Sequence, residues 1–167
     1  MQDEQQPKKT KKQKTVPVRS LSRLAAVLAL YQMDIAGTDL GIIVDEFVNA
    51  KGPSAISLDS DEGMQIDLSS MDTDLFQDIL HGMVANQQEI DKKIHEKLNV
   101  DWPMARVDTT LRAIFRAGGY EMLKRNDIPP KVIINEYVEL SKAFFNGRET
   151  NMINAVLDSI AKDIRAL

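Results

Sequence analysis

Five lysines near the N-terminus are the residues of this chain whose type and spacing most directly suggest chemistry. They lie within seven positions, at Lys8, Lys9, Lys11, Lys12 and Lys14. The segment around them has no apolar periodicity, so it has nothing with which to build a core. Clustered ammonium groups bind polyanions by neutralising phosphates and releasing counterions. We therefore predict that residues 1–18 form a disordered lysine-rich arm that contacts nucleic acid, with a solubilising terminus as the alternative.

Two arginines follow this arm at the beginning of the first expected helix. A helix over about residues 21–36, with Ser20 as its N-cap and Gly37 as its stop signal, is predicted from an apolar stripe of Leu21, Leu24, Ala25, Leu28, Tyr31 and Ile35. Arg19, Ser22 and Arg23 would share the exposed side of that helix. Two arginines about one turn apart suggest contacts with a nucleic-acid backbone, and an ordinary solvated face is the alternative.

The charges are distributed unevenly along the 167 residues. The net charge is −4, but residues 1–33 carry +5, residues 34–105 carry −11 and residues 106–167 carry +2. A basic end on an acidic protein would bind a polyanion on one side and repel it elsewhere. The charge pattern therefore favours a partner such as RNA or DNA.

The elements that must position these residues all have helical periodicity. A central core helix is predicted over residues 107–122, with its apolar stripe on Val107, Leu111, Ile114, Phe115, Gly118 and Met122, and with Gly118 and Gly119 allowing a neighbouring helix to approach. Trp102 would anchor the preceding turn. Further helices are expected over about residues 39–49, 71–98 with a break at 86–88, 130–145 and 150–166. No strand is expected, and residues 54–70 would be a flexible acidic connection. The fold class is all-α, with a single domain over residues 19–167.

Several classes of function lack support in the sequence. There is no cysteine, and His81 and His95 have no neighbours at metal-ligand spacing, so neither a metal nor another cofactor is expected. We find no glycine-rich phosphate loop and no nucleophile motif, so an enzyme is not expected. No apolar run approaches the roughly 20 residues of a membrane helix, and no secretory signal is recognisable. We expect a soluble, cytoplasmic protein without a membrane partner.

Four segments together resemble the NusB family. They are SRLAAVLALYQMD, AIFRAGGYEMLKR, IPPKVIINEYVELSKAFF and NMINAVLDSIAK, in this order, and they span about residue 19 to the C-terminus. The resemblance implies about seven helices in two packed bundles. It further implies transcription antitermination by binding the boxA element of nascent ribosomal RNA together with the ribosomal protein NusE, and through these with the RNA polymerase elongation complex. A homodimer is compatible with the sequence.

The resemblance also implies which positions face RNA. The arginine-rich helix start of the family falls on Arg19 and Arg23, while Ser20 and Leu21 replace further arginines of some members. The family's second RNA-facing region falls on Lys142, Phe144 and the segment from Asn146 to Met152, where Arg148 replaces a residue that is often acidic and Met152 replaces a frequent phenylalanine. The alternative interpretation is that Phe144 belongs to the core, because it has helical spacing with Tyr137 and Leu140.

The resemblance also implies a protein-partner surface on the central helix, which we place at Asp108 and Arg112. Leu111 occupies a position that is often acidic in relatives, so the salt link to the ribosomal protein expected there is absent and Asp108 is the nearest substitute. Two other interpretations remain beside the RNA-binding one. One is a helical protein-interaction adaptor without RNA activity, and the other is a NusB-like RNA-binding module related to those of rRNA methyltransferases. The salt dependence of RNA affinity distinguishes an adaptor from an RNA binder, because binding to phosphates weakens steeply as the salt concentration rises.

Overall fold

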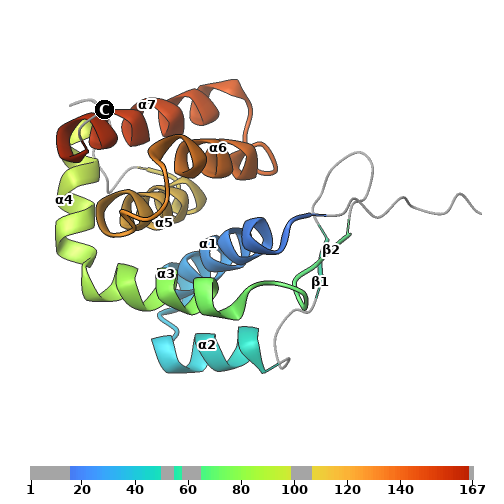
Figure 1. The fold of residues 1–167 in the computed structure, drawn as a ribbon. Coiled ribbons are helices and arrows are strands. Elements are labelled where there is room, and N and C mark those ends of the chain that lie inside the picture. Colours follow the sequence, from blue (N-terminus) through green and yellow to red (C-terminus); the bar gives the residue numbers. More distant parts are fainter. Residues whose placement is uncertain (1–15, 50–54, 58–64, 99–106, 166–167) are drawn as a thin grey trace, which may run out of the picture.

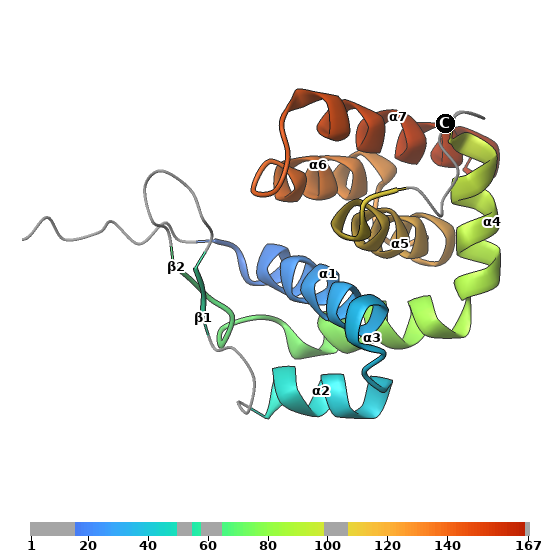
Figure 2. The same cartoon turned by 180° about the vertical axis from the view of Figure 1, so that it is seen from behind.

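Seven α-helices make up almost all of the described part of the protein (Figure 1). The computed structural model describes residues 16–49, 55–57, 65–98 and 107–165. The helices are α1 Val18–Ala36, α2 Leu40–Val48, α3 Thr73–Ala85, α4 Gln87–Lys97, α5 Thr109–Lys124, α6 Pro130–Ser141 and α7 Gly147–Ile164. Helices α1 to α3 form one bundle and α4 to α7 the other, and Figure 2 shows the same division from behind. The predicted all-α fold in two bundles is confirmed.

Helix α5 joins the two bundles, because it packs against α1 and α3 of the first bundle as well as α4, α6 and α7 of its own. The Asp108 carboxylate caps its N-terminus by accepting hydrogen bonds from the backbone N–H groups of Thr110, at 2.9 Å, and Leu111, at 3.3 Å. Such a cap stabilises a helix because the first N–H groups have no partner within it. The prediction of a central core helix is confirmed, with the predicted stripe of Val107, Leu111, Ile114, Phe115, Gly118 and Met122 buried.

The two adjacent glycines of α5 let other helices approach its backbone, as expected. A Cβ on Gly118 would lie 3.1 Å from a methyl carbon of Leu157 on α7, and one on Gly119 would lie 3.2 Å from a methyl carbon of Ile90 on α4. Both distances are shorter than ordinary van der Waals contact. These glycines therefore bring α4 and α7 close to the central helix.

Helix α1 ends at Ala36 before Gly37, as predicted, but its beginning and its buried side differ from the prediction. It begins at Val18, after Pro17 in the N-cap position, so Ser20 lies within the helix and does not cap it. Tyr31 and Ile35, which we expected to be buried, are exposed at 37% and 59%. Ser22 and Arg23, which we expected to be exposed, are buried. The beginning of α1 has contacts on several sides, because Ser20 bonds to α6, Ser22 to the residue before α3 and Arg23 to α5. An amphipathic pattern assumes one buried side.

Smaller differences concern the other segments. Asn86 separates α3 from α4 as predicted, but α6 ends at Ser141 and α7 begins at Gly147, earlier than expected. A short antiparallel pair of strands, β1 Ala55–Ser57 and β2 Gln65–Asp67, occurs in the predicted acidic loop, where we expected no strand. Three residues per strand are too few for a period of two to be recognisable. The lysine arm and Trp102 lie outside the described residues.

Arg165, directly after α7, holds the turn between α5 and α6. Its guanidinium donates hydrogen bonds to the backbone carbonyl oxygens of Met122 at 2.9 Å, Arg125 at 2.8 Å and Ile128 at 2.6 Å. The last carbonyl groups of a helix lack partners within it, and a cation there also interacts favourably with the helix dipole. Arg165 thus fixes the direction in which α6 leaves the central helix.

Candidate nucleic-acid interface

The beginning of α1 is held firmly against α3, although its outer side is exposed. The hydroxyl group of Ser22 donates a 2.7 Å hydrogen bond to the carbonyl oxygen of Asp72, the residue before α3. The backbone N–H of Asp72 in turn donates to the carbonyl oxygen of Val18, at 3.4 Å. Arg19 lies on this first turn and is exposed, so its guanidinium is available to a phosphate group.

Arg23, the second arginine expected to face RNA, is buried and forms an ion pair with Glu121 of α5. Arg23 is 3% exposed and the Glu121 side chain 0%. The guanidinium Nε lies 2.9 Å from Glu121 Oε2, and Nη2 lies 2.9 Å from Oε1, so the pair is bidentate. A buried charge is tolerated only with such a partner. The prediction that Arg23 lies on the exposed face is therefore wrong.

Tyr137 of α6 completes this buried group. Its hydroxyl donates a hydrogen bond to Glu121 Oε2. Burial, followed by the adjacent Glu121 charge, raises the pKa of the Tyr137 phenol well above its ordinary value. Burial would lower the pKa of Arg23, but the hydrogen bonds and charge of Glu121 outweigh it and raise that pKa. Arg23, Glu121 and Tyr137 thus connect α1, α5 and α6, and both hydrogen-bond donors remain protonated.

A second connection between α1 and α6 lies nearer the surface. The Ser20 hydroxyl donates a 2.7 Å hydrogen bond to Glu136 Oε2, and the Arg23 Nη1 lies 3.8 Å from the same oxygen. The Glu136 side chain is 31% exposed. We did not single out Glu136 or Glu121 from the sequence. Glu121 carries a recognisable signal, because a carboxylate three residues after Gly118 sits on the apolar stripe and requires a buried partner.

The α6–α7 junction carries the second predicted set of RNA-facing residues. Lys142 is exposed, and its Nζ lies 2.6 Å from Glu139 Oε1. Arg148 is exposed on the first turn of α7. Phe144 and Met152 are half-buried and pack against the core, so each combines a structural contact with an accessible part. Two cations and two accessible apolar groups therefore occur at this junction.

A buried hydrogen bond holds the junction together. The hydroxyl oxygens of Ser141, at the end of α6, and Thr150, in α7, lie 3.0 Å apart. Backbone N–H groups of Phe144 and Phe145 both donate to the Ser141 carbonyl oxygen, at 3.0 and 2.9 Å. In Figures 1 and 2 the α6–α7 junction and the beginning of α1 lie on the same side of the molecule. The Ser20–Glu136 hydrogen bond connects α6 with α1 directly.

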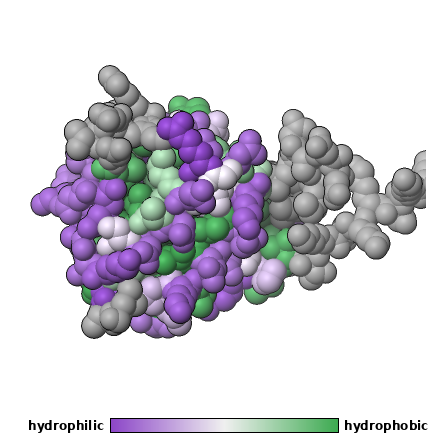
Figure 3. Space-filling model, turned by 90° about the horizontal axis from the view of Figure 1, so that it is seen from above, coloured by the Kyte–Doolittle hydropathy of each residue, from purple (hydrophilic) through white to green (hydrophobic). Residues whose placement is uncertain are grey.

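The face formed by α6 and α7 is partly apolar. Figure 3 shows hydrophobic surface between ridges of polar side chains on this face. The half-buried apolar residues of α6, the junction and α7 are Ile134, Val138, Leu140, Phe144, Phe145 and Met152. Unpaired bases stack on apolar and aromatic groups while cations hold the phosphates. The junction thus offers both kinds of contact that single-stranded RNA requires.

The residues predicted for a protein partner have contacts within the chain. Asp108 caps α5, as described above. The Nη2 of Arg112 lies 2.6 Å from Asp34 Oδ2 on α1. Next to it, Arg116 binds Asp91 of α4 through two hydrogen bonds of 2.9 and 3.0 Å. These contacts connect α1, α4 and α5, and a role of Asp108 and Arg112 toward a partner stays a prediction.

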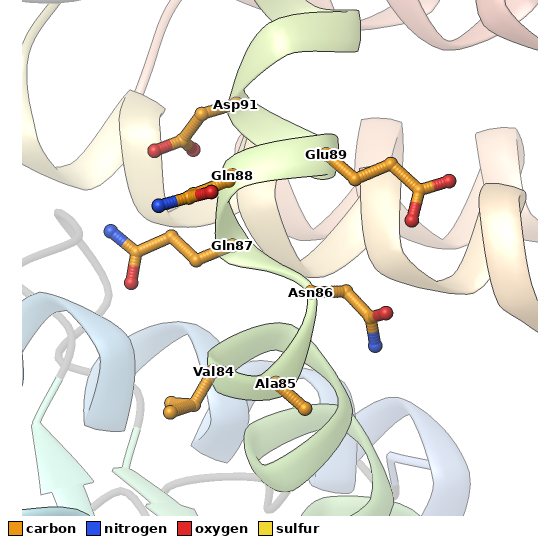
Figure 4. A pocket seen from close by; sticks show the side chains of 7 residues that line it. All are labelled: Val84, Ala85, Asn86, Gln87, Gln88, Glu89 and Asp91. Carbon is orange, nitrogen blue, oxygen red and sulfur yellow. The ribbon is translucent and has the colours of Figure 1, made fainter.

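A surface hollow lies at the α3–α4 junction. It is lined by Val84, Ala85, Asn86, Gln87, Gln88, Glu89 and Asp91. Figure 4 shows that these side chains point to opposite sides of the helix and do not converge on one point. Within the described residues, no group of three or more acidic or histidine side chains could hold a metal ion. The described helices also include none long and apolar enough to span a membrane.

Comparisons with known proteins agree with one another. The model of the NusB family matches residues 20–162. The transcription antitermination protein NusB of Caulobacter vibrioides is 44% identical over 147 residues, which are 88% of this chain and 94% of that protein. The structure of T. maritima NusB has a TM-score of 0.70 at 25% identity, covering 92% of this chain and 96% of that one. A structure of the antitermination factors NusB and NusE in complex with dsRNA shares the fold, with a TM-score of 0.67 at 22% identity, 86% of this chain and 96% of that one.

Proposed function

The chain belongs to the NusB family, and from this premise we propose that it is a transcription antitermination factor. In this proposal it binds the boxA element of nascent ribosomal RNA together with the ribosomal protein NusE, and acts with RNA polymerase in the cytoplasm. It contributes binding surfaces and no catalysis of its own. The observation that carries the proposal is the 44% identity to an antitermination protein over 94% of that protein's length.

The geometry of the interface supports this function. Arg19 on α1 and Lys142 and Arg148 at the α6–α7 junction would hold phosphate groups, since all three are exposed cations and the helix ends that carry them lie on one side of the molecule (Figure 1). The accessible parts of Phe144 and Met152 would stack with unpaired bases. The acidic segment 34–105, at −11, would repel RNA from the remainder of the surface. RNA would therefore bind in one orientation.

A titration with boxA-like RNA and a scrambled RNA of the same composition tests this proposal. We expect tighter binding to the boxA-like RNA, and a larger preference when NusE is present, because two proteins then read one RNA. Equal affinity for both RNAs, with and without NusE, would contradict boxA recognition. An absence of any salt-sensitive RNA binding would favour the adaptor interpretation instead.

Removal of the lysine arm is expected to weaken RNA binding without unfolding the protein. Because Val16 packs against the core, the truncation should remove residues 2–15 and retain everything from Val16 onward. Each phosphate contact that is lost lowers the slope of log K against log salt by about 0.7 for a single strand. We expect a shallower slope, weaker binding at low salt and an unchanged helical circular dichroism signal.

A full-length variant with the five arm lysines changed to glutamine is the matched control. It keeps the length of the arm and removes only its charge, so it should bind like the truncated protein. If both variants retain the parent's salt slope, the lysines contact no phosphate and the arm is a solubilising terminus.

A further inference from the structure

Glu136 of α6 is an acidic side chain beside a surface that we propose binds RNA. Its Oε2 accepts the hydrogen bond from Ser20, at 2.7 Å, and faces the Arg23 guanidinium at 3.8 Å. Both partners belong to the beginning of α1, and Ser20 directly follows Arg19 in the chain. We refer to Ser20, Arg23 and Glu136 as the α1–α6 latch.

We propose that the latch is a positioning device, in which Glu136 holds the first turn of α1 against α6 and thereby keeps Arg19 in place for an RNA phosphate. This inference rests on the proposed function. In this role Arg23 and Ser20 affect RNA binding without contacting RNA. This agrees with the burial of Arg23 and its bidentate pairing with Glu121. Glu136 would then be a positioning residue that raises RNA affinity although it is negatively charged.

The geometry explains why the first turn needs such a support. The exposed Arg19 must keep one orientation to contribute to binding, because an unrestrained side chain and helix end lose entropy when RNA binds. On its α3 side, the first turn is held by Ser22 and Asp72. On its α6 side, Ser20, the residue after Arg19, donates a hydrogen bond to Glu136. Loss of Glu136 therefore frees the turn on the side of the α6–α7 junction.

The sign of a mutational effect separates positioning from simple electrostatics. Removal of a carboxylate near bound phosphates reduces repulsion, so electrostatics alone predicts tighter binding for Glu136→Ala. Positioning predicts weaker binding, by about tenfold. Glu139→Ala is the matched control, because Glu139 lies on the same helix one turn later, with its side chain 70% exposed and paired with Lys142. This control should bind RNA as tightly as the parent or more tightly.

The experiment measures dissociation constants for boxA-like RNA for the parent, Glu136→Ala and Glu139→Ala, each also combined with Arg19→Ala. We expect Glu136→Ala to weaken RNA binding about tenfold relative to the parent. The same substitution should have almost no effect on binding when Arg19 is already replaced by alanine. A loss of stability alone would reduce affinity equally with and without Arg19. Additive effects in this cycle, or tighter binding of Glu136→Ala, would overturn the inference, as would an equal loss in Glu139→Ala.

Two further variants guard against misfolding of Glu136→Ala. Glu136→Gln retains an oxygen that accepts from Ser20 and should recover part of the affinity, whereas Ser20→Ala removes only that hydrogen bond and should lose part of it. If Glu136→Ala does not fold, the RNA affinities of Glu136→Gln and Ser20→Ala test the inference in its place. The inference is overturned if both variants bind RNA as tightly as the parent. If the parent protein binds no RNA, both the proposed function and the inference are contradicted. A parent that binds RNA as proposed, while Glu136→Ala behaves like Glu139→Ala, contradicts the inference alone.

Discussion

Replacement of Glu121 by alanine is expected to lower the free energy of unfolding by about 3–5 kcal/mol, the usual cost of breaking a buried ion pair from one side. Glu121 accepts hydrogen bonds from both Arg23 and Tyr137, and its side chain is 0% exposed. Without it, the Arg23 guanidinium is left buried with Glu136 as its remaining carboxylate, at 3.8 Å. Urea denaturation of the parent and the variant measures this difference.

The double variant Arg23→Met with Glu121→Met is the control for this result. Replacing a whole buried ion pair by apolar groups is often neutral or stabilising, whereas removing one partner is not. The double variant should therefore be more stable than Glu121→Ala. If Glu121→Ala unfolds at the same urea concentration as the parent, Arg23 is not buried in solution. The prediction from the sequence that Arg23 lies on the exposed side of α1 would then be correct.

Leu157→Ala is expected to destabilise the protein by about 2–5 kcal/mol, the range for a fully buried leucine. Leu157 is 0% exposed on α7, and its methyl carbons lie 3.1 and 3.2 Å from where a Cβ on Gly118 would be. Alanine would leave a cavity beside this glycine, and neither residue could fill it. Thermal unfolding followed by circular dichroism measures the loss.

Asn154→Ala is the matched control for Leu157→Ala, because Asn154 is exposed on the same helix. Alanine has a higher helix propensity than asparagine, so this variant should be at least as stable as the parent. An unchanged melting temperature in Leu157→Ala would place Leu157 on the surface and contradict the packing of α7 on α5.

The apolar stripes could be predicted from the sequence because they depend on local spacing. Ile153, Val156, Leu157 and Ile160 recur at helical intervals in the sequence, and all four are buried in α7. The stripe was a poorer guide at helix ends, where Ile164 is 37% exposed because α7 there reaches the edge of the molecule. Periodicity indicates which side of a helix is apolar, but not how far its packing partner extends.

The burial of Arg23 could not be predicted in this way. An arginine next to a lysine arm is expected to face solvent, and its partner Glu121 lies 98 positions later in the chain. The resemblance to a family transfers positions, but it does not state whether a side chain is exposed. The same reasoning applies to Arg165, whose backbone contacts with the α5–α6 turn lie 37 to 44 positions away. Non-local polar contacts of this kind become visible only in the folded structure.

The most direct test of the composite RNA surface compares charge reversals in its two halves. The variants are Arg19→Glu, Lys142→Glu with Arg148→Glu, and Lys92→Glu as a control on α4, which lies across the molecule from the beginning of α1 (Figure 1). The measurement is the dissociation constant for boxA-like RNA at one low salt concentration. We expect the first two variants to bind the RNA about tenfold or more weakly than the parent, and the third to bind it as tightly as the parent. If the Lys142 and Arg148 reversals bind like the parent while Arg19→Glu does not, the α6–α7 junction is not part of the RNA surface.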